Sequence, residues 1–187
     1  MSEINQRVVC NGVDFQSVQN TNFKTMRISV HFMLPIDKNH ISANAVLPAL
    51  LCRASKQYPD YTKLSRRLSE LYGASLNAEV QKLGDTQLLS ISTVGLADQF
   101  TLNGESVSKE LAELMCSIIF DPPFENGTFR QEDFNQEIRQ TMELIRNSMI
   151  NESMQNIVVK KLCAIKSHMA FRVLGPKMQY VHCSPMI

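Results

Sequence analysis

Histidine and cysteine are the side chains of this chain best suited to metal or nucleophilic chemistry. The four histidines are His31, His40, His168 and His182, and no two of them lie four residues apart. Two histidines at that spacing on a helix would share one face and could clamp a zinc ion. The five cysteines, at positions 10, 52, 116, 163 and 183, form no Cys-x-x-Cys. Their wide spacing predicts reduced thiols rather than a zinc ribbon or a disulfide framework.

Other catalytic patterns are also missing from the sequence. There is no Gly-x-Ser-x-Gly elbow of a serine hydrolase and no glycine-rich phosphate loop. An active metallopeptidase would have to take ligands from residues without a shared spacing, such as His31, His40 and Glu143. We keep this as an alternative hypothesis, and we expect no cofactor.

Composition bounds the class of protein. At 187 residues the chain fits one domain or a fragment of a larger protein, and 44% hydrophobic residues suffice for a core. The net charge of +1 gives no reason to expect nucleic-acid binding. No apolar run reaches 18 residues, and the N-terminus lacks a signal pattern, so we expect no membrane association and a cytoplasmic location.

Four segments with alternating or apolar character predict strands, at 13–18, 26–34, 75–80 and 86–94. Turn-rich residues between the members of each pair predict two hairpins. The segments 41–54, 61–72, 98–119 and 130–165 show helical spacing, with a break expected near Asn151. Because strand pairs alternate with helix pairs, we expect an α+β fold in which helix pairs pack on a mainly antiparallel sheet.

Several local signals refine these helices. Pro48 lies inside the first helix, which should therefore start late, near Asn44, or kink. Asp60 should cap the second helix and Gly73 should end it in a left-handed conformation. The basic cluster of Lys63, Arg66 and Arg67 is interpreted as a solvated face rather than an anion site. After residue 166 the sequence has no clear period, so we expect a domain over 1–166 and an irregular, truncated or out-of-frame segment over 167–187.

A family resemblance rests on two neighbouring stretches of the sequence. The first runs from Ala45 to Asp60 and contains Leu-Pro-Ala-Leu-Leu and Tyr-Pro. The second is Leu64-x-x-x-Leu68-x-x-Leu71-Tyr-Gly-Ala-Ser-Leu-Asn-Ala. Together they resemble the N-terminal domain of the insulinase/pitrilysin family of zinc peptidases, and the likeness covers about residues 13–165.

The resemblance implies that the family's zinc chemistry has been lost. In the family, a helix carries His-x-x-Glu-His, whose histidines bind zinc and whose glutamate takes a proton from the metal-bound water. The two histidine positions fall on Ala45 and Ala49, and the glutamate position falls on Pro48. The family's third ligand, a glutamate on a later helix, falls near Glu143 or Leu144. We therefore expect no metal site and no catalytic residues.

The same resemblance suggests a role in binding. The Leu-Pro replacement is most similar to a non-catalytic bacterial branch whose members occur beside an active paralogue and are associated with elongation factor P modification. We expect a catalytically inactive homologue that pairs with an active one, self-associates, or holds a peptide along a sheet edge. An interaction domain unrelated to peptidases is the further alternative.

Overall fold

The computed structural model describes residues 3–20, 22–148 and 178–183, which form one sheet with helices packed on it. The strands are β1 (Glu3–Cys10), β2 (Val13–Gln19), β3 (Thr25–Pro35), β4 (Ser75–Leu83), β5 (Thr86–Leu96) and β6 (Met178–Cys183). The helices are α1 (Ile41–Leu51), α2 (Tyr61–Glu70), α3 (Val107–Phe120) and α4 (Gln131–Ser148), with a short 3-10 turn, η1, at Asp98–Phe100. The predicted α+β class is confirmed.

The six strands lie in the order β1-β2-β6-β3-β5-β4. All neighbouring strands are antiparallel except β2 and β6, which are parallel. The sheet is therefore mainly antiparallel, as predicted. Within the described part of the chain, β1 and β4 form its two edges.

One of the two predicted hairpins is confirmed and the other is wrong. The strands β4 and β5 form a hairpin whose turn contains Gly84 at φ +58°. The strands β2 and β3, predicted to pair, are instead separated by β6, and β2 forms a hairpin with β1. The sequence analysis did not predict β1. Its signal was Asn11-Gly12, where Gly12 adopts φ +80°, a left-handed conformation that favours glycine in a turn.

The core lies between one face of the sheet and the helices. Alternate residues of β5 are buried, from Gln87 through Leu89 and Ile91 to Thr93, because they point towards α1 and α3. The strand β3 contributes Val30 to the same face. The helix α3 packs its apolar stripe of Leu111, Leu114, Met115 and Ile118 into this core.

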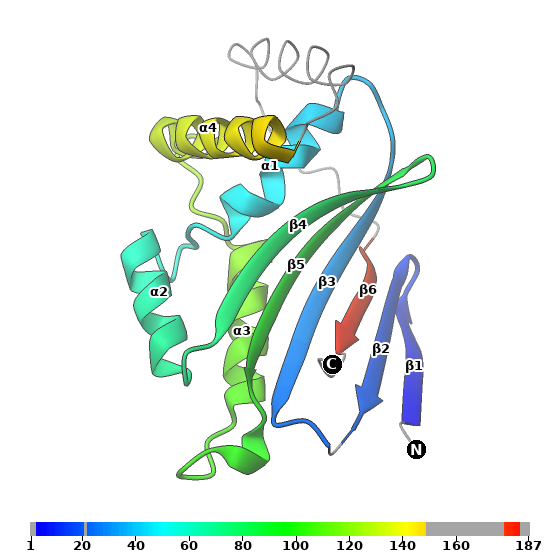
Figure 1. Cartoon of the computed structure of the whole chain (residues 1–187), viewed down its shortest axis with the longest axis vertical. Helices are drawn as coiled ribbons and strands as arrows, with labels where there is room; N and C mark the ends of the chain where they lie inside the picture. The colour runs from blue at the N-terminus through cyan, green and yellow to red at the C-terminus, as the bar shows by residue number, and fades with distance from the viewer. Residues whose placement is uncertain (1–2, 21, 149–177, 184–187) are drawn as a thin grey trace.

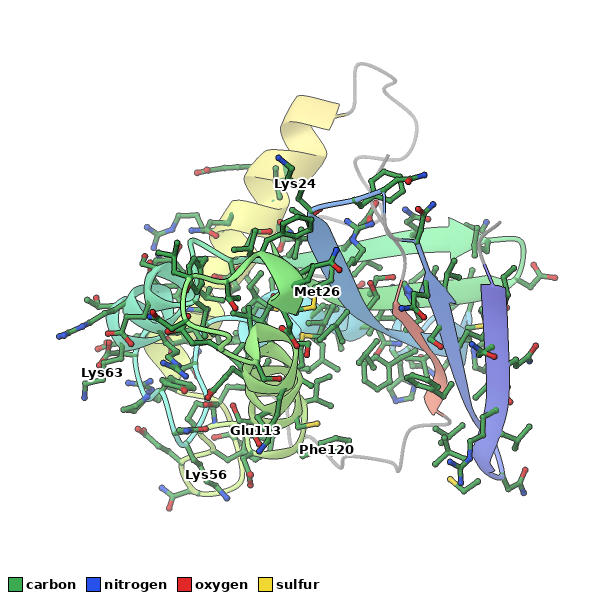
Figure 2. All side chains as sticks on the ribbon, turned by 90° about the horizontal axis from the view of Figure 1, so that it is seen from below. Lys24, Met26, Lys56, Lys63, Glu113 and Phe120 are labelled. Atoms are coloured by element: carbon green, nitrogen blue, oxygen red, sulfur yellow. The ribbon has the colours of Figure 1, made fainter. Side chains whose placement is uncertain are left out.

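Figure 1 shows how the helices are distributed. The helix α3 runs alongside β5, while α4 lies across α1 at one end of the sheet, where the two helices are in contact. Seen from below, the helices gather beside β3, β4 and β5, and β1 and β2 lie at the far side (Figure 2). No helix in the described ranges is long and apolar enough to cross a membrane.

The helices correct two details of the sequence analysis and confirm two others. The first helix begins at Ile41 rather than near Asn44 and includes the buried Pro48. The third begins at Val107, not at residue 98, and the intervening loop contains Gly104 at φ +70°. In the second helix, Asp60 accepts a hydrogen bond from the Lys63 backbone amide and Gly73 has φ +70°, so both predicted signals are confirmed.

Of the C-terminal segment 167–187, the structure describes residues 178–183. Residues Met178–Cys183 form β6, so the expectation that 167–187 is irregular throughout is wrong. The boundary at 166 and the helix break near Asn151 lie outside the described residues. Residues 149–165 of the last predicted helix likewise lie outside the described residues, since α4 is described to Ser148.

Candidate functional site

The helix α1 carries the three positions that the sequence analysis matched to a zinc motif. Ala45 and Ala49 are half-buried and Pro48 is buried. Because four residues make about one helical turn, Ala45 and Ala49 lie one above the other on one face. A methyl group and a pyrrolidine ring have no lone pair for a metal and no proton to transfer. These positions can pack but cannot do peptidase chemistry.

The helix α4 packs directly against α1 through a small apolar cluster. Val46 and Leu50 of α1 contact Phe134 and Ile138 of α4, and all four are at least 92% buried. Met142 packs against the edge of the cluster. This contact fixes the part of α4 that can face the residues following Ala49.

A carboxylate interrupts the apolar stripe of α4 at this contact. Glu137 lies between Phe134 and Ile138, and its side chain is 8% exposed. Its Oε1 accepts a hydrogen bond from Nη1 of Arg53 at 2.7 Å. Burying a carboxylate without a partner would cost roughly several kcal/mol. The packing of α4 against α1 therefore depends on this ion pair.

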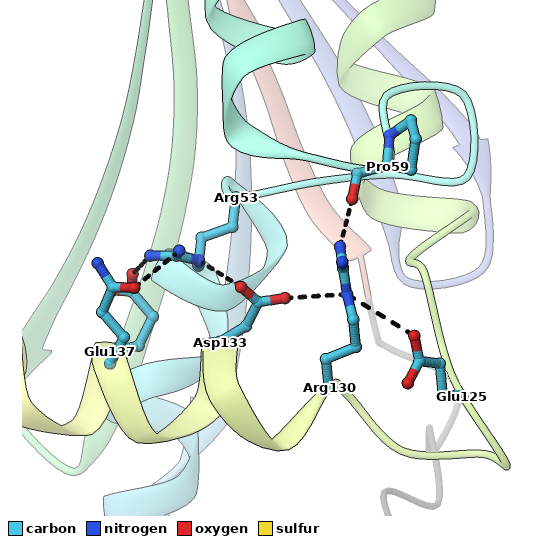
Figure 3. A network of polar contacts seen from close by, with 7 residues as sticks. Arg53, Pro59, Glu125, Arg130, Asp133 and Glu137 are labelled. Atoms are coloured by element: carbon cyan, nitrogen blue, oxygen red, sulfur yellow. Dashed lines mark hydrogen bonds and ion pairs between the residues drawn. The ribbon is translucent and has the colours of Figure 1, made fainter.

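Arg53 uses all three nitrogens of its guanidinium group on α4 (Figure 3). Besides the bond to Glu137, Nε donates to Oδ1 of Asp133 at 3.1 Å and Nη2 donates to Oε1 of Gln136 at 3.1 Å. Burial acts to lower the pKa of Arg53, but the hydrogen bonds and charges of Glu137 and Asp133 outweigh burial and raise it. The guanidinium is thus held permanently charged between α1 and α4.

A second arginine continues the network (Figure 3). Nε of Arg130 lies 3.2 Å from Oδ2 of Asp133, and Nη2 donates to the backbone carbonyl of Pro59. Asp133 therefore bridges two guanidinium groups, one on each oxygen. The network ties the start of α4 to the segment that connects α1 and α2.

Cys52, the residue that follows α1, lies near enough to Glu137 to feel its charge. Burial raises the pKa of the Cys52 thiol to about 12, and the charge of Glu137 adds to the rise. Cys52 and Arg53 follow Ala49 by three and four residues, which is the spacing of neighbours on one helical face. The carboxylate that α4 brings to the residues just after the end of α1 is therefore Glu137.

The sequence analysis expected the position of the third ligand near Glu143 or Leu144. Glu143 is exposed, and Leu144 is 69% exposed. The apolar contact with α1 is made by the preceding turns of α4, through Phe134 and Ile138. The position of the third ligand at Glu143 or Leu144 therefore stays a prediction, and the sequence analysis did not single out Glu137, the acidic residue directly before the apolar Ile138.

The structure does not bring together the ligands of the alternative active-enzyme hypothesis. Nδ1 of His31, on β3, lies 2.8 Å from Oγ of Ser90. His40 precedes α1 and pairs with Asp37 at the exposed start of the helix. Across the described ranges, no three His, Cys, Asp or Glu side chains are placed to hold a metal ion. Zinc therefore does not fit the residues around α1, where two methyl groups, a proline ring and a neutralised carboxylate stand.

The basic cluster on α2 is a solvated face, as predicted. Arg66 pairs with Glu70, and Arg67 pairs with both Glu70 and Glu110 of α3. Lys63 lies 3.6 Å from its helix cap, Asp60. Because each cation already has an acidic partner, the cluster is not arranged as an anion site.

Comparisons with known proteins point to peptidases. No family model matches the chain. The sequence is 24% identical, over 135 residues, to the Bacillus subtilis (strain 168) protein named "Probable inactive metalloprotease YmfF". That match covers 72% of this chain and 32% of the relative. These findings support a metallopeptidase-like relationship.

Two solved structures share the fold. A conserved protein from Enterococcus faecalis V583 superposes with a TM-score of 0.79 at 22% identity, over 96% of this chain and 48% of that one. A protease from Helicobacter pylori superposes with a TM-score of 0.63 at 11% identity, over 100% of this chain and 47% of that one. The chain thus spans about a third of the curated relative and about half of each solved structure.

Proposed function

We propose that this chain is a catalytically inactive homologue of insulinase/pitrilysin-type zinc peptidases that acts as a binding partner or scaffold. One observation carries the proposal. The helix pair α1–α4 is packed together, yet α1 presents Ala45, Pro48 and Ala49, and the adjacent carboxylate of Glu137 is committed to Arg53. A site without donors can neither hold zinc nor activate water. The relationship to a metalloprotease named as inactive supports the same conclusion.

The part of the scaffold best suited to binding is the edge strand β4. It forms one border of the sheet, and α1 lies against it. Seven of its nine residues are exposed, from Ser75 to Leu83. An extended peptide can add to such an edge by main-chain hydrogen bonds, with alternate side chains reading the adjacent surface. We therefore place the bound polypeptide along β4, beside the helix whose catalytic groups are absent.

The partner in this proposal is an active homologue that retains His-x-x-Glu-His and is encoded by a neighbouring gene. Both proteins would act in the cytoplasm of a bacterium. The link to elongation factor P modification belongs to the same proposal and rests on the sequence resemblance. In such a pair, this chain would hold or orient a polypeptide while the active subunit supplies the zinc chemistry. Self-association would use the same exposed edges in the absence of the partner.

Hydrogen exchange tests the proposed binding edge. The chain is mixed with a synthetic extended peptide of about 12 residues, or with the neighbouring homologue, and exchange of backbone amides is followed by mass spectrometry. Protection should appear in β4 peptides, Ser75–Leu83, and not in the opposite edge strand β1, Glu3–Cys10. Protection confined to β1, or at neither edge with either ligand, would remove β4 from the proposal.

A further inference from the structure

Two largely buried carboxylates of α4 are neutralised by two arginines at the α1–α4 contact. Glu137 is 8% exposed and Asp133 is 23% exposed, so both carboxylates are largely removed from water. Two acidic groups one helical turn apart repel each other unless cations lie between or beside them. The described residues that supply positive charge here are Arg53 and Arg130, and only Arg53 contacts Glu137.

The position of Arg53 in the sequence is as informative as its contacts. Ala45 and Ala49 lie one turn apart on α1, and Arg53 follows Ala49 by four residues, in the turn just after the helix ends at Leu51. The amide of Arg53 still donates to the carbonyl of Leu50, which keeps that turn tightly wound. The guanidinium therefore extends from the turn that follows α1, and it reaches the carboxylate of Glu137 on α4.

Guanidinium chemistry suits this place. A planar fork can donate to several acceptors at once and stays charged at any physiological pH, whereas a lysine ammonium is a single point charge. Arg53 donates to Asp133, Gln136 and Glu137, three residues within two turns of α4. Its side chain is 18% exposed, so these bonds are only partly screened by water.

We propose that Arg53 is the built-in cation of the α1–α4 contact, which neutralises Glu137 in place of a divalent metal ion. The comparison with a metal rests on the proposed function, since it takes Glu137 as the acidic group that faces the lost motif. Packing of α4 against α1 is then independent of metal supply. The guanidinium also closes the site, because Glu137 is not free to bind another cation.

A mutant cycle with Arg53→Met, Glu137→Gln and the double variant tests the charge role. Arg53→Met leaves a buried carboxylate without its cation, so the midpoint temperature of thermal unfolding should fall by about 5–15 °C. Adding Glu137→Gln removes the uncompensated charge and should restore more than half of that loss. If Arg53→Met does not fold, folding of the double variant gives the same answer. The control Lys56→Met breaks an ion pair of 3.7 Å whose side chains are 68% and 62% exposed, and should shift unfolding by less than about 2 °C.

Two results would overturn the role of Arg53. One is a fall in unfolding temperature for Arg53→Met that is no larger than the fall for Lys56→Met. The other is a double variant that unfolds at no higher temperature than Arg53→Met alone. Either result would show that the contact does not depend on neutralising Glu137, whatever the function of the chain.

Zinc titration separates this inference from the proposed function. Ala45→His with Ala49→His supplies two imidazoles, and zinc affinity is measured with Arg53 present and with Arg53→Met. We expect at least tenfold tighter binding when Arg53 is absent, because Glu137 is then free as a third ligand. Equal affinities in the two backgrounds would overturn the inference and leave the proposed ancestry of the site intact. Failure of zinc to bind in both backgrounds would count against that ancestry, while the mutant cycle still decides the role of Arg53.

Discussion

Gly95 of β5 lies where side chains of α3 pack tightly against the sheet. A Cβ atom built there would lie 2.5 Å from Cδ1 of Leu111 and 3.6 Å from both Cβ of Ala74 and Cγ1 of Val107. Ordinary carbon contacts are about 3.5–4.0 Å, so the first distance would have to open by roughly 1 Å. Leu111 is fully buried, which leaves it little room to turn away. We therefore predict that Gly95→Ala destabilises the protein.

The expected magnitude follows from two opposing effects. Adding a methyl group to a packed core costs about 1–3 kcal/mol, and replacing glycine in a strand returns about 0.5–1 kcal/mol of backbone entropy. The net loss should be about 0.5–2 kcal/mol, or a fall of roughly 1–8 °C in Tm for a chain of this length. Since the clash is with the end of a side chain, Gly95→Ala with Leu111→Val should be less destabilised than the sum of the single changes, by about 0.5 kcal/mol or more.

Urea and thermal unfolding of the four proteins in this cycle would measure both quantities. Ser92→Ala, on the half-buried opposite face of the same strand, serves as the matched control and should change stability by less than about 1 kcal/mol. A Gly95→Ala variant as stable as the parent, or strict additivity with Leu111→Val, would refute the close packing of α3 on β5.

Three further predictions concern other parts of the molecule. Because Cys52 has a pKa of about 12, iodoacetamide at pH 8 should modify the exposed Cys10 and Cys116 in the native protein and reach Cys52 only after unfolding; equal rates at the three sites by peptide mapping would be inconsistent with this. At the start of α3, burial acts to raise the pKa of Asp98, but hydrogen bonds from Ser108 and Ser106 outweigh it and hold the pKa below its ordinary value of 3.8. Asp98 therefore stabilises the protein above pH 3.8, and this stability is lost as the pH falls through the lowered pKa. The free energy of unfolding should decline less steeply below about pH 4 in Asp98→Asn than in the parent. The same dependence on pH in both proteins would count against the cap. On the edge strand β1, Ile4 and Val8 are 69% and 67% exposed, so the chain should self-associate in sedimentation velocity and Ile4→Lys with Val8→Lys should reduce this association; a clean monomer at high concentration would contradict the prediction.

The strands and helices with strong periodicity could be predicted from the sequence, because local pattern and burial agree there. The alternation from Met26 to Leu34 became β3, and the cap at Asp60 and the stop at Gly73 bound α2. The third helix was predicted too early, because Asp98 has the character of a helix start. Its carboxylate does cap α3, but it reaches forward to the amide of Ser108.

Strand pairing could not be read from local pattern. The insertion of β6 between β2 and β3 joins segments more than 140 residues apart, and nothing in the sequence near 20 signals it. The sequence predicts that Ala45, Pro48 and Ala49 share one helix, and the structure has all three on α1. Arg53 and Glu137 were missed because an ion pair across 84 residues depends on the register of α4 against α1, which periodicity alone leaves undetermined.

The central claim is that α1 no longer supports zinc chemistry, and metal content measured together with peptide hydrolysis tests it most directly. The purified chain is incubated with zinc, passed through a desalting column and analysed for metal per chain and for turnover of a mixed peptide substrate. We predict substoichiometric zinc and no turnover that a chelator abolishes. One zinc ion per chain, retained through the column and accompanied by chelator-sensitive hydrolysis, would contradict the account.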